Sequence, residues 1–202
     1  MVKSFKIEEM THQRIPNNLK KLGLISSREI QKKLGVSQPT ISRLVKSGEL
    51  LKFGHSFYAH PALEIPPQDL DFATACAKFG PKSAIGGLTA LFHYGLIEQA
   101  PAQVWVIVPP SKKGSDRFYR VIRTKTSIKN GIDAFPYYRI TNLERSVIEA
   151  MKFGKKIGER VVIGSARKAL SEGLTTEKKL GLMAKKLNLK FILERYWESI
   201  II

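Results

Sequence analysis

The decisive stretch of the chain reads Ser27-Arg28-Glu29-Ile30-Gln31-Lys32-Lys33-Leu34-Gly35-Val36-Ser37-Gln38-Pro39-Thr40-Ile41-Ser42-Arg43-Leu44. Its residue types predict two short helices joined by a tight turn at Gly35. Ser26 and Glu29 have the spacing of a capping box for the first helix. Ser37 can cap the second helix, where Pro39 suits the first turn because an N–H at that position would have no helical partner. We therefore predict a helix-turn-helix.

The two faces of this motif differ in chemistry. Its apolar residues have helical spacing and should pack the helices together: Ile30, Leu34, Val36, Ile41 and Leu44. The outward residues at and after the turn are expected to contact DNA: Ser37, Gln38, Pro39, Thr40, Ser42, Arg43 and Lys46. The second helix of such a motif lies in the major groove, where Gln and Arg can form bidentate contacts with adenine and guanine. The alternatives are a helical hairpin with a solvated polar face, or a fold used for protein contacts.

A small hairpin is predicted directly after the second helix. Residues 50–59 have the pattern of two short strands around Gly54-His55. With a first helix expected over 12–22, this hairpin completes a winged helix-turn-helix. Lys52 and His55 in the wing would contact phosphate or the minor groove, or would simply be solvated. Because three prolines fall within 61–67, we expect a linker there and divide the chain into a DNA-binding domain, 1–65, and a C-terminal domain, 69–202.

The C-terminal domain is predicted to mix helices and strands. Two helices are expected over 70–78 and 85–94, and strands over 104–108, 119–124 and 137–141. Helices dominate from Asn142 onward and should form a bundle at the end of the chain. The fold class expected for the whole chain is α+β, a winged helix-turn-helix followed by a mixed α/β domain that ends in a helical bundle.

Charge points to a polyanionic partner. The 202 residues include 34 Lys and Arg against 17 Asp and Glu, a net charge of +17. A second basic surface is expected on the C-terminal helices, formed by Lys152, Lys155, Lys156, Arg160, Arg167 and Lys168. It would add phosphate contacts or bind an acidic partner, and its alternative is a solvated helix surface.

Several classes of protein are disfavoured. A single cysteine, Cys76, excludes an intramolecular disulfide and a cysteine-rich zinc site, and it fits a reducing, cytoplasmic setting. The chain has no apolar run long enough to span a membrane. A metal-dependent nuclease is the strongest enzymatic rival, but Asp133 with Glu177 and Lys179 match its carboxylate pattern poorly. We expect no enzymatic activity, no cofactor and no metal.

Four further segments resemble the AbiEi family of type IV antitoxins. They are Gly86-Gly87-Leu88-Thr89-Ala90-Leu91, His93-Tyr94-Gly95-Leu96, Val104-Trp105-Val106-Ile107 and Thr141-Asn142-Leu143-Glu144-Arg145-Ser146-Val147-Ile148-Glu149-Ala150. The last is similar to a family helix in which Thr and Asp stand where this chain has Ser146 and Glu149. By their residue types, Gly86-Gly87 should allow close packing, and Glu144-Arg145 should provide a helix cap and an ion pair. The resemblance adds that Arg145 could help form a functional surface.

The resemblance implies a specific role. Members of this family are transcriptional repressors in abortive-infection operons, so the chain would bind an inverted repeat in its own operator. It would also act as the antitoxin of a separately encoded nucleotidyltransferase toxin, by direct contact or only functionally. The alternative is a plain winged-helix regulator whose C-terminal domain senses a ligand or dimerises.

Overall fold

The structure is a computed structural model that describes residues 23–53, 57–113 and 116–201. It is a mixed α+β chain with helices and two sheets. Contacts divide it into two compact units, Met1–Lys78 and Phe79–Ile202. The domains drawn from the sequence, 1–65 and 69–202, stay a prediction; they differ from this division mainly in the assignment of helix α4, Leu70–Phe79. The helix expected over 12–22 lies outside the described residues.

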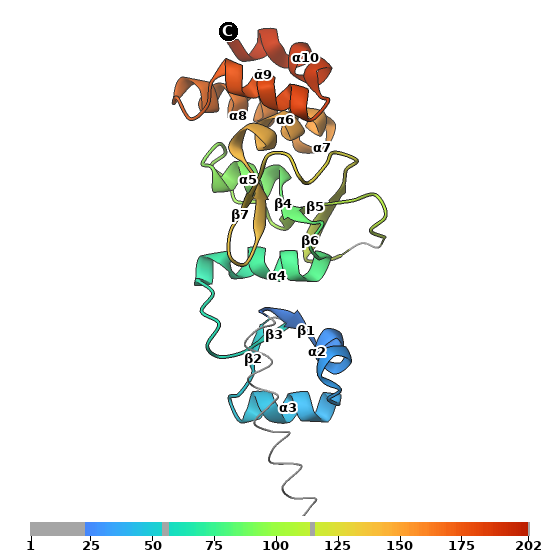
Figure 1. Cartoon of the computed structure of the whole chain (residues 1–202). Helices are drawn as coiled ribbons and strands as arrows, with labels where there is room; N and C mark the ends of the chain where they lie inside the picture. The colour runs from blue at the N-terminus through green and yellow to red at the C-terminus, as the bar shows by residue number, and fades with distance from the viewer. Residues whose placement is uncertain (1–22, 54–56, 114–115, 202) are drawn as a thin grey trace, which may run out of the picture. The chain divides into compact units, whose positions relative to one another are not determined.

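The described part of the first unit begins with two short helices and a three-stranded sheet, and it also includes most of α4 (Figure 1). The helices are α2, Ser27–Leu34, and α3, Gln38–Lys46. The strands of the sheet are β1 Ile25–Ser26, β2 Leu51–Phe53 and β3 Phe57–Ala59. They lie in the order β1-β3-β2, and both pairs are antiparallel. The two strands expected over 50–59 are therefore present, whereas β1 was not predicted from the sequence. A 3-10 turn at Pro67–Asp69 leads into α4.

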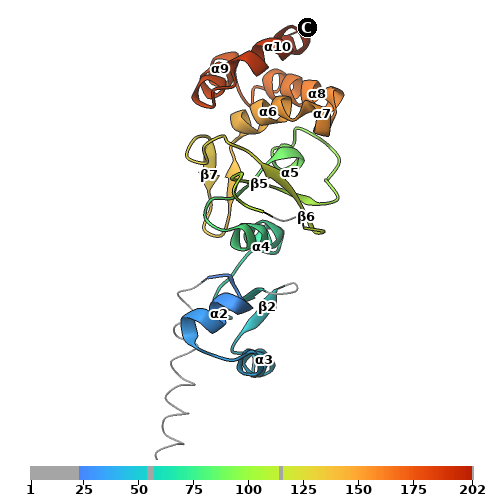
Figure 2. The ribbon, with the colours of Figure 1, turned by 90° about the vertical axis from the view of Figure 1, so that its right-hand side faces the viewer.

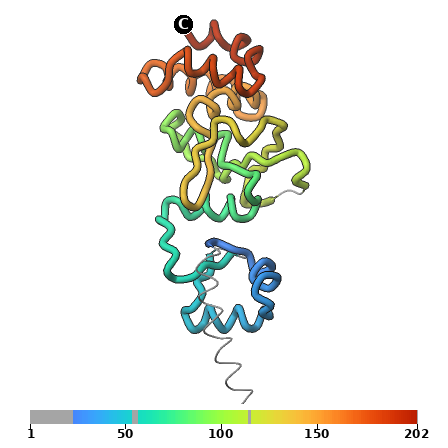
Figure 3. The backbone as a smooth tube through the Cα atoms, in the orientation of Figure 1, coloured from blue at the N-terminus to red at the C-terminus, as the bar shows by residue number. Residues whose placement is uncertain are grey.

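The second unit is built on a five-stranded mixed sheet with the order β6-β5-β4-β8-β7. The strands are β4 Ala84–Ile85, β5 Val104–Val108, β6 Tyr119–Arg123, β7 Ile132–Ala134 and β8 Arg139–Thr141. Strands β5 and β6 run parallel, as do β4 and β8, whereas β4–β5 and β7–β8 are antiparallel. Figure 3 follows the chain through the β7–β8 hairpin into the helices beyond it.

Helix α5, Gly87–His93, packs against β5 and against helix α6, Leu143–Lys152. The sequence predicted its start at Ile85, but Ile85 lies in β4 and pairs with Val106 and Ile140. The glycine pair at the start of α5, Gly86 and Gly87, permits the close approach that the sequence indicated. A Cβ atom on Gly87, whose φ is +55°, would lie 2.5 Å from Trp105 Cε3.

Five helices follow the sheet and gather on one side of it (Figure 2). They are α6 Leu143–Lys152, α7 Gly154–Ile157, α8 Glu159–Ser171, α9 Glu177–Lys186 and α10 Lys190–Ile201. Side-chain caps start α6 at Asn142 and α9 at Thr176. Their apolar faces form the main core of the unit, with Ile148, Ala166 and Leu180 fully buried. α6 contacts each of the other four, so it is the central helix of this layer.

Candidate nucleic-acid interface

The turn between α2 and α3 has the local geometry that the sequence predicted. Ser26 and Glu29 form the full capping box, with Ser26 Oγ 2.7 Å from Glu29 Oε2 and Glu29 N donating to Ser26 Oγ at 3.3 Å. The hydrogen bond from the Ser26 side chain holds the pKa of Glu29 below its ordinary value. α2 ends at Leu34 and is capped by Gly35, whose φ of +66° is left-handed. Ser37 Oγ then accepts the N–H of Thr40 at 3.4 Å and caps α3.

A small core fixes the orientation of α3 against α2. Ile30, Ile41 and Leu44 are buried in one cluster with residues of the sheet. Leu34 and Val36 pack against this cluster and are partly buried. The five apolar residues predicted to join the helices are therefore all found in or against one core. Because α3 is held by this apolar face, its opposite face is presented outward.

The outward face of α3 carries the predicted DNA-contacting residues. Ser37, Gln38, Pro39, Ser42, Arg43 and Lys46 are exposed, and Thr40 is half-buried. Lys52 is exposed on β2, and His55 lies outside the described residues. A short, exposed helix start with an amide, a guanidinium and hydroxyl groups can donate to base edges and phosphates.

One contact across the turn was not predicted. Gln31 Nε2 on α2 donates to Gln38 Oε1 at the start of α3, over 3.1 Å. This hydrogen bond restrains Gln38 while its amide nitrogen can still donate outward. α2 also exposes Arg28, Lys32 and Lys33, which raise the positive charge beside the turn. The turn separates Gln31 from Gln38, so the helical periodicity of α2 or α3 alone did not reveal the contact.

The residues of the predicted second basic surface have different environments. Lys155, Lys156 and Arg160 are exposed on α7 and at the start of α8. Arg167 Nε donates to the carbonyl of Ser199 at 2.9 Å, and Lys168 lies 3.9 Å from the carboxylate of Glu172. Lys152 is half-buried, and its ammonium donates to Thr124 Oγ1 and Thr126 Oγ1, each at 3.2 Å. Of these six residues, Lys155, Lys156, Arg160 and Arg167 are therefore exposed, and Lys152 and Lys168 are half-buried.

The carboxylates considered for a nuclease have other surroundings. Asp133 lies on the edge strand β7 and accepts the hydroxyl of Tyr94 at 3.1 Å. Burial raises the pKa of Tyr94, and the charge of Asp133 acts in the same direction. Glu177 begins α9. Within the described part of the chain, no group of three or more His, Cys, Asp or Glu could hold a metal ion.

Comparison with known proteins finds a family resemblance for the part of the chain that contains the exposed helix. Residues 13–61, which include α2, α3 and the strands after them, match a sequence model described as "Transcriptional regulator, AbiEi antitoxin". This stretch is similar to AbiEi antitoxins. The resemblance to AbiEi drawn from the sequence is thus confirmed over these residues. Across residues 62–202, the AbiEi resemblance remains a prediction.

A structural likeness covers more of the chain. The RV2827C protein from Mycobacterium tuberculosis has a similar fold, with a TM-score of 0.57 at 13% sequence identity. The similarity covers 95% of this chain and 76% of that one. No curated protein matches the sequence. Among the helices described, none combines the length and the apolar character needed to cross a membrane.

Proposed function

We propose that the chain is a DNA-binding transcriptional repressor that also serves as the antitoxin of a type IV toxin–antitoxin system. In this proposal α2, α3 and the sheet form a winged helix-turn-helix, with α3 as the recognition helix. The target of the protein is an inverted repeat in double-stranded operator DNA. The protein acts in the cytoplasm, where that DNA is found. The match of residues 13–61 to AbiEi regulators supports an antitoxin–regulator role.

The observation that carries the proposal is the exposed polar face of α3. Gln38, Ser42 and Arg43 are exposed, whereas Ile41 and Leu44 of the same helix are buried. A helix held in this way can enter the major groove without disturbing its own core. The net charge of +17 favours approach to DNA and binding to its phosphates.

The toxin partner is proposed from the family resemblance. A cognate nucleotidyltransferase would be neutralised by the C-terminal domain, directly or only functionally, while the winged helix represses the operon. The alternative is a plain winged-helix regulator whose C-terminal domain senses a ligand or dimerises. A nucleotidyltransferase gene beside this one would favour the antitoxin.

Arg43→Ala tests the recognition helix. We expect it to weaken binding to the DNA upstream of the chain's own gene by about 1–3 kcal/mol, because a bidentate contact to guanine is lost. Binding to scrambled DNA should change much less, as measured by fluorescence anisotropy. Arg28→Ala is the matched control, since Arg28 is an exposed arginine on α2. Equal losses on both DNAs for Arg43→Ala would make Arg43 a phosphate contact, and Gln38→Ala provides the parallel test.

Rescue of cells from the toxin tests the antitoxin role. Residues 69–202 should restore growth to cells that express the neighbouring toxin gene, because this proposal gives the winged helix no part in neutralisation. The full chain with Arg43→Ala should also restore growth, although it represses poorly. Growth is measured over a range of inducer concentrations with antitoxin levels matched by immunoblot. If the full chain with Arg43→Ala is stable but rescues nothing, the plain regulator is the better account.

A further inference from the structure

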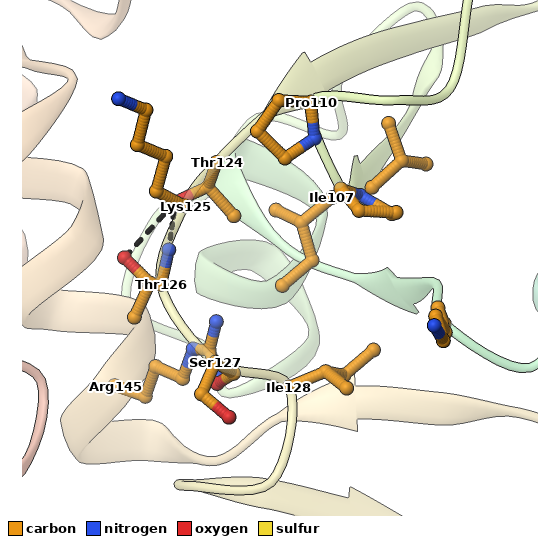
Figure 4. A pocket seen from close by; sticks show the side chains of 11 residues that line it. Ile107, Pro110, Thr124, Lys125, Thr126, Ser127, Ile128 and Arg145 are labelled. Carbon is orange, nitrogen blue, oxygen red and sulfur yellow. Dashed lines mark hydrogen bonds between the residues drawn. The ribbon is translucent and has the colours of Figure 1, made fainter.

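The second unit contains a small pocket at one edge of its sheet, shown in Figure 4. The parallel strands β5 and β6 end here, at Val108 and Arg123, and the chain segments that follow them form its walls. The cavity measures about 170 Å³. A cavity of roughly 150 Å³ holds a benzene molecule, so this one has room for a ring with a small substituent. The carboxyl ends of parallel strands are a common place for ligands in α/β proteins.

The lining has an apolar part and a polar, cationic part. The apolar part comes from Ile107, Pro110 and Ile128, together with the neighbouring Val108 and Pro109. The polar part contains three hydroxyl side chains and three cationic ones, from Thr124, Thr126, Ser127, Lys82, Lys125 and Arg145. Among the residues that the structure describes, no acidic residue lines the pocket. In Figure 4 Ser127 lies beside Arg145, Thr126 lies between Arg145 and Thr124, and Ile107 and Pro110 lie across from Thr126 and Ser127. This division suits a ligand with an apolar body and one polar group.

In the polar part of the pocket, the existing hydrogen bonds leave hydroxyl hydrogens available to donate to a ligand. Thr124 Oγ1 donates to Thr126 Oγ1 at 3.0 Å, and the ammonium of Lys152 donates to both oxygens at 3.2 Å. Thr126 Oγ1 therefore accepts twice, and its own hydrogen has no acceptor among the residues that the structure describes. Ser127 Oγ accepts from Lys129 N at 3.2 Å, so its hydrogen is likewise available. A group that only accepts hydrogen bonds would complete this arrangement.

Arg145 holds the loop that carries these hydroxyl groups. Its Nη1 donates to the carbonyls of Ser127 and Asn130 at 2.7 and 2.6 Å, and its Nη2 pairs with Glu149 at 3.0 Å. Its Nε is buried and has no hydrogen-bond partner among the described residues. Because Glu149 balances the charge of Arg145, the uncompensated positive charge at the pocket comes from Lys82, Lys125 and the nearby Lys152.

We propose that this pocket binds a small organic anion. The carboxylate or phosphate of the ligand accepts hydrogen bonds from Thr126 and Ser127, and its charge is balanced by the lysines. The apolar body of the ligand rests on Ile107, Pro110 and Ile128. The proposal stands apart from DNA binding, because every residue it uses belongs to the second unit.

The test is a titration of the full chain, with its isoleucine methyl groups observed by NMR at constant pH and ionic strength. The probes are benzoate, phenyl phosphate and the neutral benzyl alcohol, so the two anions distinguish a carboxylate from a phosphate. We expect saturable shifts at Ile107 and Ile128 with at least one anion, at a Kd of about 1 mM or tighter. Benzyl alcohol should bind at least about tenfold more weakly, because it carries no charge. Equal affinity for benzyl alcohol, or no shifts with either anion, would overturn the proposal.

Two variants locate the anionic group. Thr126→Val keeps the shape of the side chain but removes the hydroxyl, and it should weaken binding of the anion about tenfold or more. Lys125→Met should weaken it about two- to fivefold, since Lys125 is exposed. Lys185→Met is the matched control, because Lys185 is an exposed lysine on α9 that does not line the pocket. If both pocket variants melt like the wild type and bind the anion equally well, the proposed site is wrong.

Discussion

Glu149→Ala is expected to lower the free energy of unfolding of the second unit by about 3–5 kcal/mol. Arg145 and Glu149 are one turn apart on α6, and both side chains are almost fully buried, at 0% and 1% exposed. Removing the carboxylate leaves a guanidinium in the interior without its counter-charge. The same arginine binds the loop carbonyls of Ser127 and Asn130, so its displacement should also loosen that loop. Urea unfolding followed by circular dichroism measures the change.

The matched control is a second pair with the same spacing. Lys190 and Glu194 lie 3.1 Å apart on α10, but their side chains are 74% and 61% exposed. Glu194→Ala should therefore change stability by less than about 1 kcal/mol, because water screens the pair. Similar effects for Glu149→Ala and Glu194→Ala would mean that the Arg145–Glu149 pair does not support the fold.

Gly87→Ala is expected to destabilise the second unit by about 3 kcal/mol. The backbone of Gly87 is left-handed, with φ of +55°, and the added Cβ would meet the buried indole of Trp105 at 2.5 Å. Trp105 lies on β5, which pairs with β6 on one side and β4 on the other, and its side chain is buried. It therefore has little room to shift. Thermal unfolding of the variant gives the size of the loss.

Gly164→Ala is the control for this substitution and should have the opposite sign. Gly164 lies inside α8, and a Cβ atom there would meet nothing within 4 Å. Alanine should stabilise the helix by about 0.5–1 kcal/mol, because glycine has the greater backbone entropy in the unfolded chain. A Gly87→Ala variant as stable as the wild type would contradict the packing described for α5 against β5.

Features set by neighbouring residues could be predicted from the sequence. The capping box of Ser26 and Glu29, the cap at Ser37 and the turn at Gly35 all depend on residues within a few positions of each other. The run Val104–Val108, which contains only β-branched residues and one aromatic residue, likewise forms the strand that its composition indicated. For the same reason, the inward and outward faces of α3 followed from helical periodicity alone.

Features set by distant partners could not be predicted from the sequence. β1 and β4 are two residues long, and each exists because a remote strand supplies its hydrogen bonds. Ile85 was assigned to a helix because its pairing with Ile140 is not visible in the local sequence. Near Arg145, the sequence indicated a cap and an ion pair, but not that the cap is Asn142 or that the ionic partner is Glu149. The pocket beside Arg145 is lined by segments that are distant in the sequence, 107–110 and 124–128, so no local pattern revealed it.

The central claim is that the face of α3 reads a specific DNA sequence. Its most direct test compares the affinity of the full chain for the DNA upstream of its own gene with that for a scrambled duplex of equal length and composition. Fluorescence anisotropy at one fixed, near-physiological salt concentration measures both. We predict that the upstream DNA binds tighter by a factor of about a thousand or more, as expected for specific recognition. Equal affinity for the two duplexes would contradict the account and leave only binding driven by the positive charge of the chain.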